Sequence, residues 1–192
     1  MSSSIEKPVE PPSASSGVLP VYASLDIDAP IEDVWNVMTN FPDYGSWNPF
    51  IRKQTILVSP SSVPVPLTDQ TPHAGQYMLL YVHTPPRLRE PHFLFKPFQV
   101  SQTVVRLKLV DNEKHRLAWR TYGLPEWLLW CERWQTLTEH GKGCKYESYE
   151  VFGGLVAYMM WAICLKVLLL KGVTEMAEAL KLKSQKNYIK GD

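Results

Sequence analysis

Two glutamates in the last third of the chain have the setting that acid–base chemistry needs. Glu132 lies in "WLLWCERWQTLTE" (127–139) and Glu150 lies in "CKYESYEVF" (144–152), two segments with the composition of neighbouring strands. If the turn between them centres on Gly141, the two carboxylates lie directly opposite each other. Carboxylates that share an aromatic cavity raise the pKa of at least one of them, which gives a proton donor or base near neutral pH.

Aromatic residues flank this pair on the predicted strands. Strand alternation puts Trp130 and Trp134 on the face of Glu132. We therefore predict Glu132 and Glu150 as catalytic residues, and the candidates for substrate binding are Trp119, Arg120, Trp130, Trp134, Tyr146, Tyr149 and Met159. Two alternatives stay open. A shift of one residue in register undoes the pairing, and the glutamates could instead lie on a solvated face or pair with Arg120 or Arg133.

The other reactive residues provide no second candidate site. The five histidines are scattered without the spacing of metal ligands, and the chain has no glycine motif for phosphates or dinucleotides. Cys131 needs a neighbouring base to act as a nucleophile, and the sequence places none beside it. We predict no metal and no cofactor. With a net charge of +1 and charged residues at 20%, we expect no nucleic acid as a partner.

The elements that must position these residues follow a simple order. Residues 18–30 have strand composition, and a short amphipathic helix runs from Pro30 until Asn40 and Pro42 end it. We predict further strands at 76–83, 103–111, 115–123, 127–139 and 144–152, a long loop at 59–75, and an edge strand or lid at 89–100. One long helix spans residues 153–186. This order predicts an α+β fold, in which a curved antiparallel sheet wraps around the C-terminal helix and leaves a cavity between them.

We expect one domain at residues 18–188 after a disordered leader at 1–17. The leader is rich in Ser, Pro and Glu, so it has too little apolar surface to offset the entropy of ordering. It also lacks the basic start and apolar core of a signal peptide. The three cysteines form no CxxC pair, which favours reduced thiols in a cytoplasmic protein.

Both ends of this domain resemble one superfamily. The segment "IDAPIEDVWNVMTNFPDYGSWNPFI" resembles the opening of the START-like superfamily (Bet v 1-like, polyketide cyclase/dehydrase-type, SRPBCC proteins), and "YEVFGG" and "VTEMAEALKLKSQ" are similar to its closing segments. The resemblance implies a helix-grip fold with a short broken helix pair after the first strand and an internal apolar cavity. It also implies that one end of the cavity is plugged by Phe41, Tyr44, Trp47 and Phe50.

The first half of the last helix is apolar on nearly all sides. Between Leu155 and Leu170, Lys166 is the one charged residue. This stretch is shorter than the ~20 residues that a membrane span needs. We expect a buried helix that closes the pocket. The alternative is that residues 155–170 contact a membrane surface or a second copy of the chain.

Two classes of function remain for a protein that binds a bulky apolar molecule, whether polyketide-, terpenoid- or lipid-like. The first is a cofactor-free cyclase, dehydratase or isomerase of secondary metabolism, which would act mostly by positioning its substrate. The second is a non-enzymatic carrier of a lipid or another hydrophobic ligand, and the lack of a sharp catalytic motif favours it. A chaperone-like or assembly module is a weaker third reading. For the first two classes we predict that the cavity is lined by Trp119, Trp130, Trp134 and Met159.

Overall fold

Seven antiparallel strands form a single sheet in the computed structural model, which describes residues 10–61 and 63–191. The strands are β1 (Leu19–Ile27), β2 (Ile51–Leu57), β3 (Tyr77–His83), β4 (Val100–Asp111), β5 (Arg116–Thr121), β6 (Trp130–His140) and β7 (Gly143–Gly153). Their order across the sheet is β1-β7-β6-β5-β4-β3-β2, so β1 and β2 form the two edges. The predicted α+β class is confirmed.

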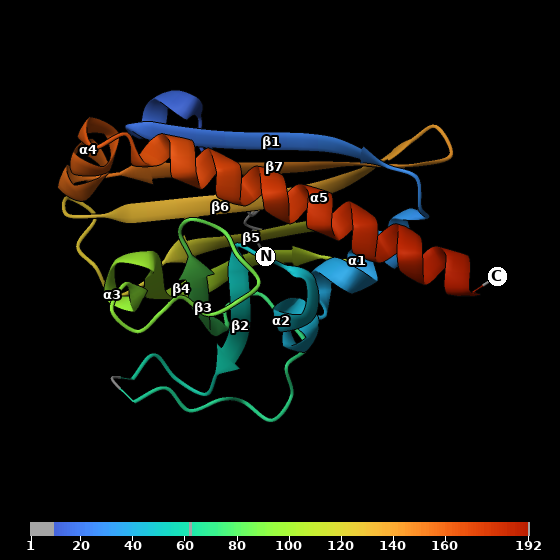
Figure 1. Ribbon diagram of the computed structural model, residues 1–192, viewed down its shortest axis with the longest axis horizontal. Helices are drawn as coiled ribbons and strands as arrows, with labels where there is room; N and C mark the ends of the chain where they lie inside the picture. Colours follow the sequence, from blue (N-terminus) through green and yellow to red (C-terminus); the bar gives the residue numbers. More distant parts are fainter. Residues whose placement is uncertain (1–9, 62, 192) are drawn as a thin grey trace, which may run out of the picture.

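One long helix covers the concave face of this sheet. The helices are η1 (Ala14–Ser16), α1 (Ile31–Thr39), η2 (Phe41–Asp43), α2 (Tyr44–Trp47), α3 (Lys96–Gln99), α4 (Leu155–Ala162) and α5 (Leu165–Gly191). Figure 1 shows α5 crossing the sheet beside β1 and β7, with α1 and α2 toward one end of the molecule and α3 and α4 at the other. This arrangement is the predicted helix grip.

The broken helix pair after β1 follows from its sequence. Pro30 sets the entry to α1, and the acidic residues Glu32 and Asp33 occupy the first turn, where the helix dipole favours negative charge. After the break, the Tyr44 hydroxyl donates to the Met38 carbonyl at 2.6 Å. These contacts fold the aromatic segment back onto α1.

The segment then leads into β2 through a buried asparagine. Asn48 is fully buried, and its Oδ1 accepts hydrogen bonds from the backbone N–H groups of Phe50 and Ile51, both at 2.9 Å. The predicted plug residues Phe41, Tyr44, Trp47 and Phe50 are all buried. Of these four, Phe50 reaches the cavity described below.

The long helix α5 rests on the sheet through small and apolar side chains. Val173, Met176 and Leu180 are buried on the side that faces β1 and α1. At Gly172 an added Cβ would clash with the Phe50 ring, so glycine is the residue that allows this close approach. The approach fixes how near the helix comes to the sheet.

The helix predicted at 153–186 is two helices. α4 and α5 are bent by 92° at a break where Cys164 has a φ of +56°. The apolar run has no polar stripe, so its periodicity could not show where the break falls. No single helix in the described ranges is long and apolar enough to cross a membrane; α4 and α5 meet that criterion only when taken together, as a bent pair.

Two other local predictions differ from the structure. β2 was missed, because Arg52, Lys53 and Gln54 break its apolar pattern. Of the two predictions for residues 89–100, the edge strand is wrong: the segment is mostly loop and contains the short helix α3, since its prolines prevent a regular strand. Of the predicted leader, residues 1–9 lie outside the described residues, and Ala14–Ser16 form the short 3₁₀ helix η1.

Candidate functional site

A cavity of about 410 Å³ lies between the concave face of the sheet and the start of α5. Its walls come from β2 to β7, from α3 and the segment before β6, and from α4 and the first two turns of α5. Most of the lining side chains are apolar. Small-molecule sites in proteins are typically apolar clefts of roughly 300–1,000 Å³ with a few placed polar groups, and this cavity matches that description.

One arginine is buried in the cavity wall. Arg133 on β6 is 1% exposed, and its Nε donates to Ser148 Oγ at 3.1 Å. Its Nη2 approaches Met176 Sδ at 3.4 Å. The guanidinium carbon lies 5.7 Å from the ring centre of Trp119 and 5.8 Å from that of Phe50. Aromatic rings and weak acceptors therefore hold most of this cation within the described chain, and strong acceptors for its five N–H donors are few.

The carboxylate of Glu150 on β7 also lines the cavity and is buried. Its Oε2 lies 4.0 Å from Arg133 Nη1, which is longer than a hydrogen bond. Cys131 Sγ donates to Oε1 at 3.0 Å. Among the described residues nothing donates to the buried Oε2. A ligand hydroxyl in the cavity, beside the line between these two atoms and about 2.8 Å from each, would accept from Arg133 and donate to Glu150.

The Cys131 thiol is a hydrogen-bond donor in this cluster. Burial raises its pKa well above the usual value, and the negative charge of Glu150 raises it further. The thiolate is the reactive form of cysteine, so this side chain is poorly suited to act as a nucleophile. Cys131 helps instead to hold the Glu150 carboxylate in place.

The predicted pairing of Glu132 with Glu150 is wrong by one residue. Glu132 lies opposite Val151, and Glu150 lies opposite Arg133. The reason is the turn, a two-residue loop whose centre falls between Gly141 and Lys142 rather than on Gly141, with His140 paired to Gly143. Because neighbouring residues of a strand point to opposite faces, this shift puts the two glutamates on opposite sides of the sheet.

Glu132 is held by cations on the convex face. It accepts from Lys108 Nζ at 2.8 Å, from Arg120 Nη1 at 3.1 Å and from Trp134 Nε1 at 2.9 Å. Burial alone would raise its pKa, but the hydrogen bonds from Lys108 and Trp134 outweigh burial and lower it. Glu132 has neither the position nor the pKa that the predicted acid–base role requires.

The other predicted binding residues divide between the two faces. Trp119 lines the cavity, as predicted. Trp130, Trp134, Arg120 and Tyr149 share the convex face with Glu132, and the Arg120 guanidinium lies 4.7 Å from the Trp130 ring centre. These four were misplaced with Glu132, because our prediction assigned the tryptophan-bearing face of β6 to the cavity.

Two further predictions differ in detail. Tyr146 is buried on the concave face and accepts from Gln135 Nε2 at 3.2 Å, but it lies outside the cavity lining. Met159 points to solvent, and the next residue, Met160, lines the cavity in its place. Arg133 and Cys131 line the cavity, although the sequence alone did not place them in the site. With the turn centred correctly, strand alternation alone would have put both beside Glu150.

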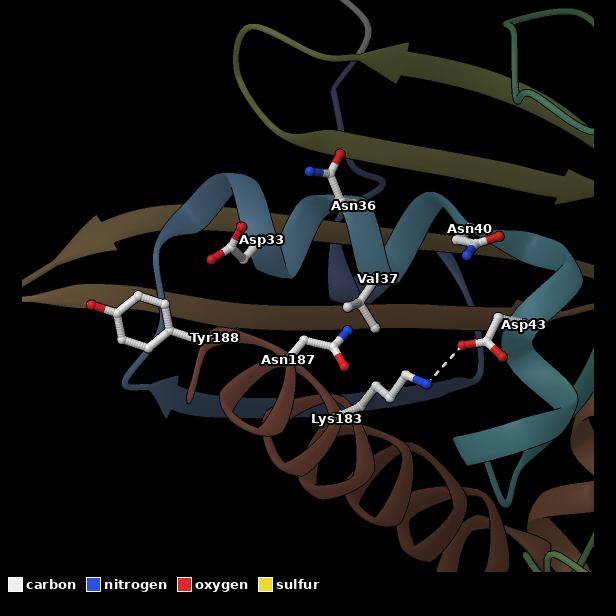
Figure 2. A pocket seen from close by; sticks show the side chains of 8 residues that line it. All are labelled: Asp33, Asn36, Val37, Asn40, Asp43, Lys183, Asn187 and Tyr188. Atoms are coloured by element: carbon white, nitrogen blue, oxygen red, sulfur yellow. Dashed lines mark ion pairs between the residues drawn. The ribbon is translucent and has the colours of Figure 1, made fainter. Parts of the chain in front are cut away.

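A second pocket, of about 470 Å³, is polar and lies between α1 and the far end of α5 (Figure 2). Lys183 from α5 reaches Asp43 at 2.9 Å across its rim. The hydrogen bond from Lys183 lowers the pKa of Asp43. This groove offers much less apolar surface to a ligand than the cavity beneath α5. Across the described residues, no group of three or more His, Cys, Asp or Glu side chains could hold a metal ion.

The chain matches no protein family model, and no curated protein matches its sequence. Solved structures do resemble it. The hypothetical protein jhp0584 from Helicobacter pylori superposes with a TM-score of 0.68 at 9% identity, covering 95% of this chain and 99% of that one. The Zhui aromatase/cyclase from Streptomyces sp. R1128 gives 0.61 at 13% identity, with 87% and 93% covered.

A plant protein shares the same architecture. The major latex-like protein 151 from Panax ginseng gives a TM-score of 0.54 at 6% identity, covering 86% of this chain and 96% of that one. These likenesses span most of each chain. The protein therefore shares the helix-grip fold of these structures, the fold that the resemblance of its end motifs implied. At such low identities the likeness defines the fold alone.

Proposed function

We propose that this protein binds an apolar small molecule that carries a hydroxyl group, and that the cavity beneath α5 is the binding site. The observation that carries the proposal is the pair formed by Arg133 and Glu150. It is a buried cation and a buried carboxylate, separated by 4.0 Å, in the wall of an otherwise mostly apolar cavity. A hydroxyl is the ligand group that can accept from one and donate to the other.

Matched probes test this proposal. Naphthol and methoxynaphthalene are nearly the same size, but only naphthol can donate to Glu150. A hydrogen bond to a charged group contributes about 1.5–3 kcal/mol, so wild-type protein should bind naphthol about tenfold more tightly or better. Titration of the intrinsic fluorescence of naphthol measures both affinities, with methoxynaphthalene as a competitor.

A pair of variants on β4 localises the binding. Thr103 lines the cavity, whereas Gln102, its neighbour, is exposed on the other face. Thr103→Trp should fill the cavity and abolish binding of both probes, and Gln102→Trp should leave both affinities unchanged. Melting temperatures confirm that each variant folds. Equal affinity for the two probes, or binding that survives Thr103→Trp in a folded protein, refutes the proposed site.

Catalysis is a second candidate function, and one observation favours it. The Glu150 Oε2 atom faces the cavity without a hydrogen-bond donor among the described residues, so it is placed to take a proton from a bound molecule. The Zhui structure is named an aromatase/cyclase, which supports this class for a related fold. A cofactor-free cyclase, dehydratase or isomerase would use Glu150 as its base and Arg133 to stabilise developing negative charge.

Deuterium exchange distinguishes a catalytic function from a carrier function. The α-protons of the bicyclic ketone β-tetralone exchange with D₂O when a base is positioned beside them, and NMR follows the rate. Glu150→Gln should lower the protein-dependent rate by about 10²–10⁴-fold, the usual contribution of a positioned base. Glu139→Gln, at the exposed end of β6, is the control. If wild-type protein binds the ketone without accelerating exchange, the carrier function stands and the catalytic one fails.

A further inference from the structure

The end of the molecule that carries α4 exposes many large apolar side chains. Trp161 is 62% exposed and Ile163 is 72% exposed. We call this set the α4 surface, and its members on α4, α5 and the bend between them are Leu155, Tyr158, Met159, Trp161, Ile163, Val167 and Leu170. Contiguous exposed apolar surface of this kind marks an interaction site in a folded protein.

The bend makes this surface project from the body. α4 turns by 92° from α5 and packs only through one side, where Ala157 is fully buried. Leu155, Tyr158 and Met159 therefore lie on the outer side, with Trp161 next to them around the helix. Two successive turns of α5 continue the surface, because Val167 and Leu170 point away from the sheet.

Two other segments add apolar side chains at the same end. Figure 1 shows α3 and the segment between β5 and β6 at the end where α4 lies. Trp127, in that segment, is 69% exposed, and Phe93, just before α3, is 73% exposed. The cavity opens among these elements, since Leu124, Pro97 and Met160 line it and the first two are exposed.

The charges at this end favour an anionic partner. Residues 155–170 contain no acidic side chain, and the single cation Lys166 makes no ion pair with any described residue. The nearby carboxylates are neutralised: Glu126 pairs with Arg120 at 2.7 Å, and Glu90 pairs with Lys96 at 3.3 Å. The surface therefore combines apolar and aromatic side chains with one lysine, unpaired among the described residues, and no acidic side chain between residues 155 and 170, which suits contact with an anionic lipid interface.

We propose that the α4 surface docks on an anionic lipid bilayer, with α4 lying in the headgroup region and the cavity opening toward the lipid. A bilayer fits better than a second copy of the chain. An interface between two copies would cover the cavity opening, whereas a bilayer is itself a source and a sink for apolar molecules. This reason for choosing the bilayer rests on the proposed function. The exposed apolar side chains and the charges of the α4 surface are observations that do not depend on it.

Vesicle sedimentation tests the docking directly. The full chain is mixed with vesicles of phosphatidylcholine and phosphatidylglycerol, or of phosphatidylcholine alone. We expect co-sedimentation with the mixed vesicles, weakened at least tenfold by the double substitution Trp161→Ser and Ile163→Ser. The matched control removes two equally exposed apolar side chains at the other end of α5, Leu182→Ser with Ile189→Ser, and should bind like wild type. Lys166→Glu should lower binding to the mixed vesicles more than to neutral ones.

Naphthol affinity, measured on the same variants without lipid, keeps this test separate from the proposed function. It should be unchanged by Trp161→Ser with Ile163→Ser. Wild-type protein that stays in the supernatant with both vesicle types overturns the docking, whether or not naphthol binds. So does a control variant that loses as much binding as the Trp161/Ile163 variant. A dimer that this variant cannot form, seen by light scattering without any vesicle binding, assigns the surface to a second copy instead.

Discussion

Replacing Arg133 by Met tests whether the buried charges in the cavity wall depend on each other. Arg133→Met keeps an unbranched apolar stem in a shorter side chain and removes the cation, which leaves Glu150 buried with only the Cys131 thiol as a donor in the described chain. Breaking a buried ion pair costs about 3–5 kcal/mol. Because the closest approach here is 4.0 Å, we expect the lower end, about 3 kcal/mol.

The measurable effect is large for a chain of this size. One kcal/mol shifts the melting temperature of such a domain by about 2–4 °C, so Arg133→Met should lower it by about 6–12 °C. Adding Glu150→Gln removes the uncompensated charge, and the double variant should recover about 1–3 kcal/mol of the loss. Arg89→Met, at an exposed position, should change the stability by less than about 0.5 kcal/mol.

Urea unfolding of the wild type, both single variants and the double variant completes the cycle. If the losses of the two single variants simply add in the double variant, the charges do not interact. The reasoning about a coupled pair in the cavity wall would then be refuted. A destabilisation of Arg133→Met below about 1 kcal/mol would mean that water reaches Glu150, which contradicts its burial.

Three further outcomes follow from contacts outside the cavity. The pKa of Glu132 is lowered in the fold, so the ionised carboxylate stabilises the protein above its unfolded pKa, and this contribution is lost as the pH falls below about 4. Glu132→Gln should therefore reduce the pH dependence of the free energy of unfolding in urea between about pH 6 and about pH 3, and it should leave naphthol binding intact. Gly172→Ala should cost about 1–3 kcal/mol by calorimetry, because its Cβ meets the Phe50 ring. Lys183→Ala, which breaks the partly exposed pair with Asp43, should cost less than about 1 kcal/mol in urea unfolding, and less in high salt.

The fold could be predicted because its signals are local. Strand alternation, the helix start at Pro30 and the end motifs of the superfamily all depend on nearby residues. The break at Cys164 could not be predicted, because an apolar helix face that docks on the sheet looks the same in sequence as one that stays exposed. The bend of α4 away from α5 decides which apolar face is buried, and this bend depends on tertiary packing.

The candidate site was harder, since it depends on one turn. Gly141 takes a φ of +62° at the first position of a two-residue loop, the place where a type II′ hairpin turn requires glycine. The sequence "HGKG" is compatible with a turn centred on Gly141 and with one centred between Gly141 and Lys142. Only the backbone geometry shows that the arginine of β6, and not its neighbouring glutamate, faces the cavity.

The three cysteines differ enough for selective chemical labelling. Burial raises the pKa of Cys144 to about 11, and Cys131 is kept protonated as described above. Cys164 is exposed at the bend between α4 and α5. A maleimide dye added near neutral pH should therefore attach at Cys164 without any engineered cysteine. A polarity-sensitive dye attached there would lie within the α4 surface, and its fluorescence would report what that surface contacts.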